Sequence, residues 1–249
     1  MLQEERYKHI MREINLHNKV LSSDLSTLLN VTEDTVRRDL KNLSKTGKII
    51  KVHGGAISKS FNAPFQMDNE VYAQQEKQQI AEKTIKLFKN DMLILTEGGT
   101  TMVEVAKKIP DNLHATFFTL SPLVALALSE HTNLTVITIG GTLNKDASLV
   151  TGASVINQLA RINVDLCLMG ANAFSISEGL TDSDWDVVQV KTAMVRAAKR
   201  IGILTISEKL NSSQRMNVCD INQIHYLITE LSPDDPLLSD YRRLDINLI

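Results

Sequence analysis

A helix that begins after Thr32 is predicted by the run Val31-Thr32-Glu33-Asp34-Thr35-Val36-Arg37-Arg38-Asp39-Leu40. Thr32 is a favourable N-cap, and the two acids that follow it lie where the positive end of the helix dipole stabilises them. An apolar stripe at helical spacing consists of Val36, Leu40 and Leu43. The helix is expected to reach Gly47 as its C-cap. The polar face opposite the stripe holds Asp34, Arg38, Lys41, Asn42 and Lys45, with Thr35 and Arg37 beside it.

Two further helices are predicted before this run. The apolar stripe of the first consists of Tyr7, Ile10, Met11 and Ile14. The second is expected to start near Ser22, where Ser22 or Ser23 can cap the free amides. Asn30-Val31 then makes a tight turn into the third helix. Three short helices with a tight second turn are typical of a helix-turn-helix.

The sequence after Gly47 predicts a β-wing. Lys48-Ile49-Ile50-Lys51-Val52 indicates a strand, His53-Gly54-Gly55 a turn, and Ala56 the start of a second strand. Residues 1–57 hold ten Lys and Arg against seven acids, whereas the remaining residues have a net charge of −5. A basic module on an acidic body indicates a partner that is a polyanion.

A basic helix face of this kind fits the major groove of DNA. Arginine can bind guanine through two hydrogen bonds, and lysine can neutralise phosphates. The alternative is an ordinary solvated helix face. The wing beside the helices favours DNA binding.

The run from Val31 to Leu40, with Gly47 and His53-Gly54-Gly55-Ala56, closely resembles the winged helix-turn-helix of the DeoR family of bacterial transcriptional regulators. The resemblance implies a helix-turn-helix from Val20 to Asp39 and a regulator, expected to be a repressor, that binds double-stranded operator DNA. The predicted DNA contacts are Ser22, Thr32, Thr35, Arg37, Arg38, Lys41, Asn42, Lys51 and His53.

The rest of the chain predicts a second, larger domain. Residues 58–70 have no clear period and are interpreted as a linker, which leaves 1–57 as the DNA-binding domain and 71–249 as an effector-sensing and oligomerisation domain. A helix is predicted over Tyr72–Phe88. Strands are predicted at Met92–Thr96, Ala115–Thr119, Thr135–Ile139, Asp165–Met169, Ile201–Ile206 and His225–Thr229, with helices at Thr101–Ile109, Val124–Glu130 and Val187–Arg200 between them. This alternation predicts an α/β fold with a mostly parallel sheet.

Small polar residues follow four of the predicted strands. Glu97-Gly98-Gly99-Thr100-Thr101 precedes a helix, so its amides and hydroxyls could hold a phosphate. The other strand ends are Thr119-Leu120-Ser121-Pro122, Gly140-Gly141-Thr142-Leu143-Asn144 and Gly170-Ala171-Asn172. Each could be an ordinary turn. Because parallel sheets bind ligands at the carboxyl ends of their strands, the four together predict a pocket.

This second part resembles the DeoR effector domain, which is similar in fold to ribose-5-phosphate isomerase and typically senses phosphorylated sugars. The resemblance implies effector contacts at Glu97, Gly98, Gly99, Thr100, Thr101, Ser121, Gly140, Gly141, Gly170, Asn172, Lys191 and Lys209. A solvated helix lysine is an equally simple interpretation of Lys191.

Five positions depart from the family pattern: Glu97 replaces aspartate, Leu120 asparagine, Asn144 a basic residue, Val187 glutamate and Ile206 aspartate. Three of these changes exchange a polar group for an apolar one. Losing such groups weakens the binding of a sugar, because hydrogen-bond partners are left unpaired. The hypothesis is that the phosphate site is kept while recognition of the sugar is altered or lost.

Other classes of function remain as alternatives. An isomerase would need a poised carboxylate, for which Glu97 and Asp184 are the candidates. The second domain could also serve only to oligomerise the chain, as a dimer or tetramer. Trp185 could cover a ligand or pack in an interface, and the acids at Asp182, Asp184 and Asp186 cap a helix more readily than they hold a metal.

Composition limits the remaining possibilities. Two cysteines, Cys167 and Cys219, are too few for a disulfide framework or a four-ligand zinc site. No apolar run is long enough to cross a bilayer, and the N-terminus lacks the apolar core of a signal peptide. A cytoplasmic protein without cofactor, metal or membrane partner is expected.

Overall fold

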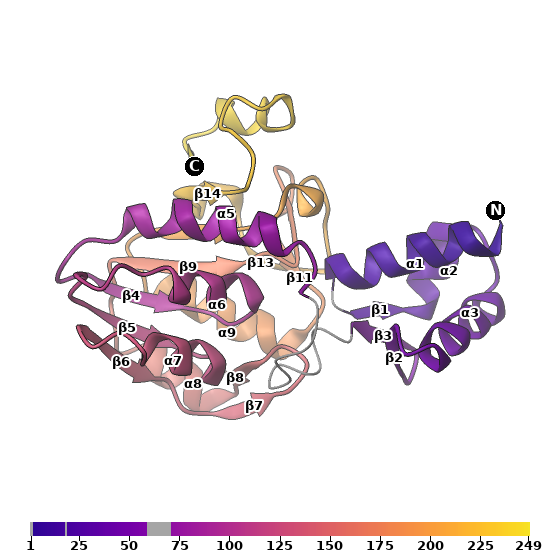
Figure 1. Ribbon diagram of the computed structural model, residues 1–249, viewed down its shortest axis with the longest axis horizontal. Coiled ribbons are helices and arrows are strands. Elements are labelled where there is room, and N and C mark those ends of the chain that lie inside the picture. Colours follow the sequence, from indigo (N-terminus) through magenta and orange to yellow (C-terminus); the bar gives the residue numbers. More distant parts are fainter. Residues whose placement is uncertain (1, 18, 59–70) are drawn as a thin grey trace. The chain divides into compact units, whose positions relative to one another are not determined.

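A computed structural model describes residues 2–17, 19–58 and 71–249 (Figure 1). The chain divides into two compact units, residues 1–72 and 73–249. Apart from Ser58, the predicted linker up to residue 70 lies outside the described residues. Among the residues described, no helix is both long and apolar enough to span a membrane.

The described residues of the first unit form three helices and a small antiparallel sheet. Its elements are α1 (Gln3–His17), β1 (Lys19–Leu21), α2 (Ser22–Leu29), α3 (Glu33–Lys45), β2 (Ile49–Val52) and β3 (Gly55–Ser58). The strand order is β1-β3-β2. The core consists of Ile10, Ile14, Val20, Leu25, Leu29, Val36, Leu40, Leu43, Ile49 and Ala56. This is the predicted winged helix-turn-helix.

The caps of α3 follow from local sequence. Thr32 is its N-cap, and the Thr35 amide donates to the Thr32 hydroxyl at 3.3 Å. The predicted C-cap was one residue too far along, since Thr46 takes that position and Gly47 follows it at φ +71°. The amides of Gly47 and Lys48 donate back to the carbonyls of the last helical turn at 3.0 Å each. Glycine suits this left-handed position because it has no Cβ.

The prediction of a serine cap on α2 is wrong. Leu21 holds the N-cap position without a side-chain hydrogen bond, and Ser22 is the first helical residue and is buried. The reason is β1, which the sequence pattern did not reveal. This strand pairs with β3 and runs directly into α2, so that the Ser22 amide donates to the Gly54 carbonyl at 2.7 Å.

The second unit is built on a seven-stranded sheet in the order β15-β14-β12-β9-β4-β5-β6, and every pair in it is parallel. Its strands are β4 (Leu93–Thr96), β5 (Ala115–Thr119), β6 (Leu134–Thr138), β9 (Leu166–Gly170), β12 (Ile201–Leu204), β14 (Tyr226–Ile228) and β15 (Asn247–Leu248). The α/β fold and the parallel sheet are therefore confirmed.

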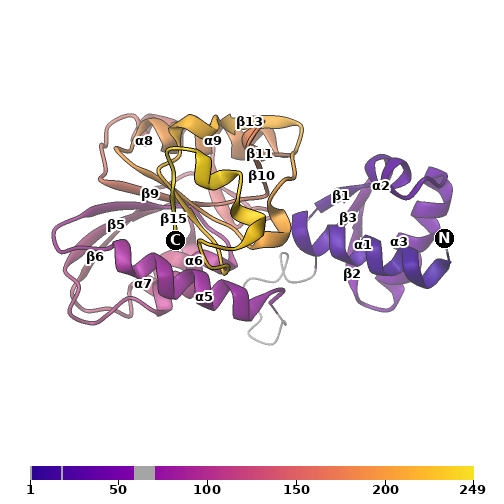
Figure 2. The same cartoon turned by 90° about the horizontal axis from the view of Figure 1, so that it is seen from above.

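Helices cover both faces of this sheet (Figure 2). One face carries α5 (Gln74–Thr84), α6 (Thr100–Lys107) and α7 (Pro122–Leu128), and the other carries α8 (Ala153–Leu159) and α9 (Trp185–Arg196). Short strands that sequence reasoning missed are β7 (Thr142–Asn144), β8 (Leu149–Thr151), β10 (Ala173–Ser175), β11 (Gly179–Asp182) and β13 (Met216–Cys219).

All four helices predicted in this unit have different ends in the structure. Compared with the prediction, α6 begins one residue earlier and α7 two residues earlier, and each ends two residues earlier. The helix predicted over Tyr72–Phe88 is α5, followed by a 3₁₀ turn at Ile85–Leu87. The helix predicted from Val187 begins two residues earlier and ends at Arg196. Its start is fixed by Asp184, whose carboxylate accepts the amides of Asp186 and Val187.

Candidate functional site

The polar face of α3 is open to solvent and carries two arginines. The side chains of Arg37 and Arg38 are 60% and 74% exposed. Each pairs with an acid one turn earlier, at 2.8 Å to Glu33 and 3.1 Å to Asp34. Exposed i,i+4 pairs contribute only about 0.3–0.5 kcal/mol, so both guanidinium groups can leave these acids for DNA at little cost.

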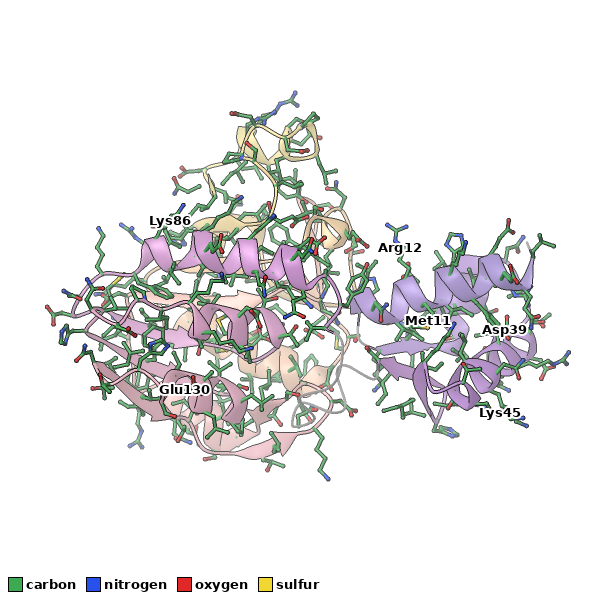
Figure 3. The ribbon with its side chains drawn as sticks, in the orientation of Figure 1. Met11, Arg12, Asp39, Lys45, Lys86 and Glu130 are labelled. Atoms are coloured by element: carbon green, nitrogen blue, oxygen red, sulfur yellow. The ribbon has the colours of Figure 1, made fainter. Side chains whose placement is uncertain are left out.

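A buried ion pair fixes α3 against α1. The Arg6 guanidinium binds Asp39 at 2.7 and 3.2 Å, and Asp39, labelled in Figure 3, is only 2% exposed. The hydrogen bond to Asp39 raises the pKa of Arg6 above its ordinary value. Asp39 was not predicted as a structural residue. The feature of the sequence that could have indicated this structural role is the position of an acid next to the apolar stripe of α3.

The predicted DNA contacts do not all reach the surface. Exposed residues are Thr32, Arg37, Arg38, Lys41, Lys51 and His53. Thr35 is half-buried, and its hydroxyl lies 2.9 Å from that of Thr32. Ser22 is buried, and Asn42 donates its amide to the Tyr7 hydroxyl at 3.2 Å, toward α1. These last two side chains therefore serve the packing of the helices.

A buried charge cluster lies at the carboxyl edge of the large sheet. The Lys191 ammonium is 3.0 Å from a Glu97 carboxylate oxygen and 3.1 Å from an Asp182 oxygen, and it donates to the Gly170 carbonyl at 3.2 Å. The Gly170 amide donates to the other Glu97 oxygen at 2.8 Å. Because Lys191 is 3% exposed, the interpretation of a solvated lysine is wrong.

The cluster shifts the pKa values of its members. Burial raises the pKa of Glu97, although the Lys191 charge opposes the shift. Burial also opposes ionisation of Asp182, but the charge and hydrogen bond of Lys191 outweigh it and hold the Asp182 pKa below its usual value. For Lys191, the attraction of both carboxylates exceeds the effect of burial and raises its pKa. The cluster thus favours the charged forms of Asp182 and Lys191, whereas burial makes Glu97 easier to protonate than an exposed glutamate.

Two more lysines lie close to this cluster. Lys209 donates to the Ala171 carbonyl at 3.0 Å, and burial together with the charges of Lys77 and Lys191 lowers its pKa to about 7. Burial lowers the pKa of Lys77 to about 8, although Glu76 and Glu104 oppose the shift. Sequence reasoning missed Lys77. Helical spacing could have indicated its position, since Lys77 stands three residues before Ile80 and therefore lies on the buried side of α5.

The Gly98-Gly99 turn lies against the next strand end. A Cβ on Gly98 would meet the Ser148 carbonyl at 3.0 Å and the Ser121 Cβ at 3.2 Å. Gly99 is the N-cap of α6 at φ +93°, and Thr100 and Thr101 follow it half-buried. Ser121 is itself buried and caps α7, so its hydroxyl is used locally.

The third predicted strand end packs against α8. Gly141 packs so tightly against α8 that a Cβ would lie 2.4 Å from the Val155 side chain. The Gly140 carbonyl accepts from Gln158 at 2.7 Å. At the fourth end, Asn172 does join the cluster, because its amide donates to Asp182 at 3.2 Å. Asn144 reaches the same side by donating to Asp184 at 3.3 Å.

The apolar departures from the family pattern belong to the core. Leu120 is 1% exposed, and Val187 and Ile206 are each 4% exposed. Two of the three acids near Trp185 also have structural partners: Asp182 binds Lys191 and Asp184 caps α9. Trp185 itself is 61% exposed. Across residues 2–17, 19–58 and 71–249, no three metal-ligating side chains are grouped to hold an ion.

A winged helix-turn-helix with exposed arginines on α3, joined in one chain to an α/β unit with a buried charge cluster, is typical of a DNA-binding regulator with a sensor domain. Family models match both parts: a DeoR-like helix-turn-helix domain at residues 6–61 and a DeoR C terminal sensor domain at residues 72–231. The chain belongs to the DeoR family. This is a family of transcriptional regulators, so the chain is a DNA-binding regulator of transcription.

Named relatives match the chain over nearly all of its length. It is 29% identical to the HTH-type transcriptional repressor GlcR of Bacillus subtilis, over 100% of this chain and 96% of the relative. It is 25% identical to the glycerol-3-phosphate regulon repressor of Haemophilus influenzae, over 94% and 92%. A solved ribose 5-phosphate isomerase from Methanocaldococcus jannaschii aligns with 55% of this chain and 54% of its own, at 16% identity and a TM-score of 0.41.

Proposed function

We propose that this regulator is a cytoplasmic repressor of carbohydrate genes that binds its operator as a homo-oligomer and is released by a phosphorylated sugar or polyol. The observation that carries the proposal is the cluster of Glu97, Asp182 and Lys191 with Lys77 and Lys209 beside it. Five ionisable groups from separate elements meet at the edge where parallel sheets bind ligands.

The phosphate of the effector would bind at the Gly99-Thr100-Thr101 turn. The free amides of α6 and the two threonine hydroxyls are donors for phosphate oxygens. Lys77 and Lys209 supply positive charge on the same side of the sheet. Their lowered pKa values show that burial disfavours the ammonium forms, and a bound dianion would reverse that cost.

The hydroxyls of the effector would bind at the carboxylates. The oxygens of Glu97 and Asp182 have lone pairs beyond those used by Lys191, and carboxylates accept strongly from hydroxyl groups. Lys191 has three acceptors around it already. It is therefore a positioning residue, which ties the ends of β4, β9 and β11 together.

The names of the relatives support a repressor that responds to a phosphorylated compound. One carries the name of a transcriptional repressor and another that of a repressor of a glycerol-3-phosphate regulon. A ligand releases DNA only if it prefers one arrangement of the regulator over another. A preference of about 1–3 kcal/mol changes operator affinity about 5- to 150-fold.

The test is operator binding by fluorescence anisotropy, with the full-length protein and DNA from its own upstream region, titrated with a panel of sugar phosphates. Trp185 is the only tryptophan and stands beside Asp184, so its fluorescence gives an independent signal of ligand binding. One phosphosugar should release the DNA and change that fluorescence. No response to any compound in either signal would contradict the proposal.

Variants separate the ligand site from the DNA surface. Lys77→Met and Lys209→Met should bind the operator normally and lose the response to the effector. Lys86→Met is the matched control, because Lys86 is exposed in the 3₁₀ turn that follows α5, labelled in Figure 3. A full response in the first two variants would exclude these lysines from the site.

A second candidate is a DNA-binding oligomer whose effector pocket has degenerated. It is favoured by the internal pairing of Lys191, which leaves Glu97 and the Gly170 amide satisfied without a ligand. Specific operator binding that ignores the whole panel would support this candidate.

A further inference from the structure

The segment from residue 115 to residue 144 is almost free of charge. It contains one Asp, Glu, Lys or Arg, namely Glu130, labelled in Figure 3, although 22% of the whole chain is charged. The segment supplies β5, α7, β6 and β7. Strand β5 lies inside the sheet, but α7 and β6 reach the surface, and surface elements this poor in charge are unusual for a chain that meets only water.

Strand β6 forms one edge of the seven-stranded sheet. In the part of the chain that the structure describes, it pairs only with β5. The Ile139 amide donates to the Thr119 carbonyl at 2.9 Å, toward β5. Because backbone groups alternate along a strand, the amides of Val136 and Thr138 point away from β5. These outward groups can pair with another strand.

The residues of β6 do not protect this edge. Natural edges are guarded by charged side chains, prolines or bulges, or are very short. The run Leu134-Thr135-Val136-Ile137-Thr138 has no charge and no proline, and four of its five residues are β-branched. The opposite edge strand, β15, is only two residues long. The sheet therefore has one open edge suited to strand addition.

Apolar side chains flank the edge. Ile137 is 39% exposed on β6, and Leu126 is 61% exposed on α7, the helix that packs on β6. A five-residue strand alone buries less than the roughly 1,200 Å² of a stable interface, so α7 would have to contribute.

We propose that the partner of this edge is a second copy of the same chain, with the two β6 strands paired antiparallel about a twofold axis, so that two sheets become one. The inference names the surface for the self-association proposed above. Residues 73–249 carry 20 Asp and Glu against 16 Lys and Arg, so each sensor unit has a net charge of −4 and two copies repel each other overall. The charge-free segment is where two copies can approach without that repulsion.

Symmetry and function agree with this partner. An antiparallel pair of identical strands is an isologous contact, the kind that closes a dimer and leaves no free edge. Helix-turn-helix regulators bind as dimers so that two recognition helices meet two half-sites. Pairing through β6 would supply the required second copy.

The test measures the mass of the full-length protein by size-exclusion chromatography with light scattering. Ile137→Lys places a charge on the edge, and Thr138→Pro removes an outward amide that β5 does not use. Both should halve the mass or raise the dissociation constant at least tenfold. Leu237→Lys is the matched control, since Leu237 is 45% exposed in a different part of the unit, and it should leave the mass unchanged.

Hydrogen exchange of the wild-type protein gives a second measurement, which does not depend on whether the variants fold. The amides of Val136 and Thr138 should be protected at high protein concentration and exchange freely on dilution. A monomeric wild-type protein, an unchanged mass in both edge variants, or exchange independent of concentration would each overturn the proposal. A monomeric wild-type protein would also contradict the self-association in the proposed function, on which this inference rests. The other two results would refute only the β6 surface, and none of the three bears on the effector response.

Discussion

Replacing Lys191 with methionine should lower the free energy of unfolding of the sensor unit by about 3–5 kcal/mol, because it removes the cation from a buried cluster and leaves the anions. Methionine keeps an apolar chain of similar length. The loss is therefore expected to come from charge and hydrogen bonding rather than from a cavity.

The structure sets this magnitude. Lys191 contacts two carboxylates, at 3.0 and 3.1 Å, whose side chains are only 10% and 8% exposed. Without the ammonium, Glu97 and Asp182 would be two like charges shielded from water. Since the free energy of unfolding of a domain is only about 5–15 kcal/mol, the variant would lose a large part of its stability. Asp182→Asn in the same background should restore part of the loss, because one of the repelling charges disappears.

The assay is unfolding in urea, followed by the fluorescence of Trp185. In the Lys191→Met protein, the pKa values of Glu97 and Asp182 should both lie above their unfolded values. A raised carboxylate pKa contributes stability that is present at low pH and lost as the pH rises through the folded value. The deficit of the variant should therefore be smaller at pH 5 than at pH 7.5.

Lys199→Met is the control for this prediction. Lys199 also binds an aspartate, Asp165 at 2.8 Å, but its side chain is 61% exposed. A surface pair contributes about 0–1 kcal/mol, so this variant should unfold nearly like the wild type. The reasoning fails if Lys191→Met costs no more than Lys199→Met, or if its deficit is the same at both pH values.

Three further predictions concern the two functional surfaces. Arg38→Ala should weaken operator binding by about 1–3 kcal/mol and relax its sequence specificity. Lys41→Ala should weaken binding to all DNA sequences alike and reduce the slope of log affinity against log salt concentration by about 1. Fluorescence anisotropy over a salt series measures both effects, and unchanged affinity in both folded variants would contradict the DNA-binding face. Gly55→Ala should disrupt the pairing of β1 with β3, because the alanine Cβ would lie 1.9 Å from the Val20 carbonyl oxygen. The affinity for DNA should fall at least tenfold, while the temperature of the unfolding transition of the sensor unit should not change. Normal DNA affinity would show that the wing tolerates the substitution. The affinity for the effector should fall between pH 7 and pH 9, because Lys209 and Lys77 lose their protons in the free protein over this range. Titration calorimetry in two buffers should show that binding takes up protons and that Lys209→Met reduces this uptake. An affinity that does not change over this pH range would exclude both lysines as phosphate contacts.

The DNA-binding unit could be predicted from local patterns to a large extent. The stripe of Val36, Leu40 and Leu43, the Thr32 cap and the strand-turn-strand of the wing all depend on residues within a few positions of one another. Strand β1 was missed because three residues carry no period. It is a strand only because β3, more than thirty residues later, supplies its partner.

The sensor site was predicted in outline and not in its chemistry. Its turns at Gly98-Gly99 and Gly170 were found because strand ends in a parallel sheet meet at one edge. Its central ion pairs were not found, since nothing near Lys191 in the chain indicates that Glu97 will lie 3.0 Å away. Lys77 was missed for the same reason, and the sequence did not reveal that Gly141 packs on α8.

By itself, the sequence determined which segments form helices and strands, where most of them end, and which family the chain resembles. These features depend on periodicity, capping and turn residues, which act over one or two turns of backbone. The tertiary structure decided which charges are buried together, which glycines serve packing and which strand remains an open edge. Such properties arise only when distant segments meet, because burial and the low dielectric that strengthens a buried charge pair belong to the assembled sheet and its helices rather than to any one segment.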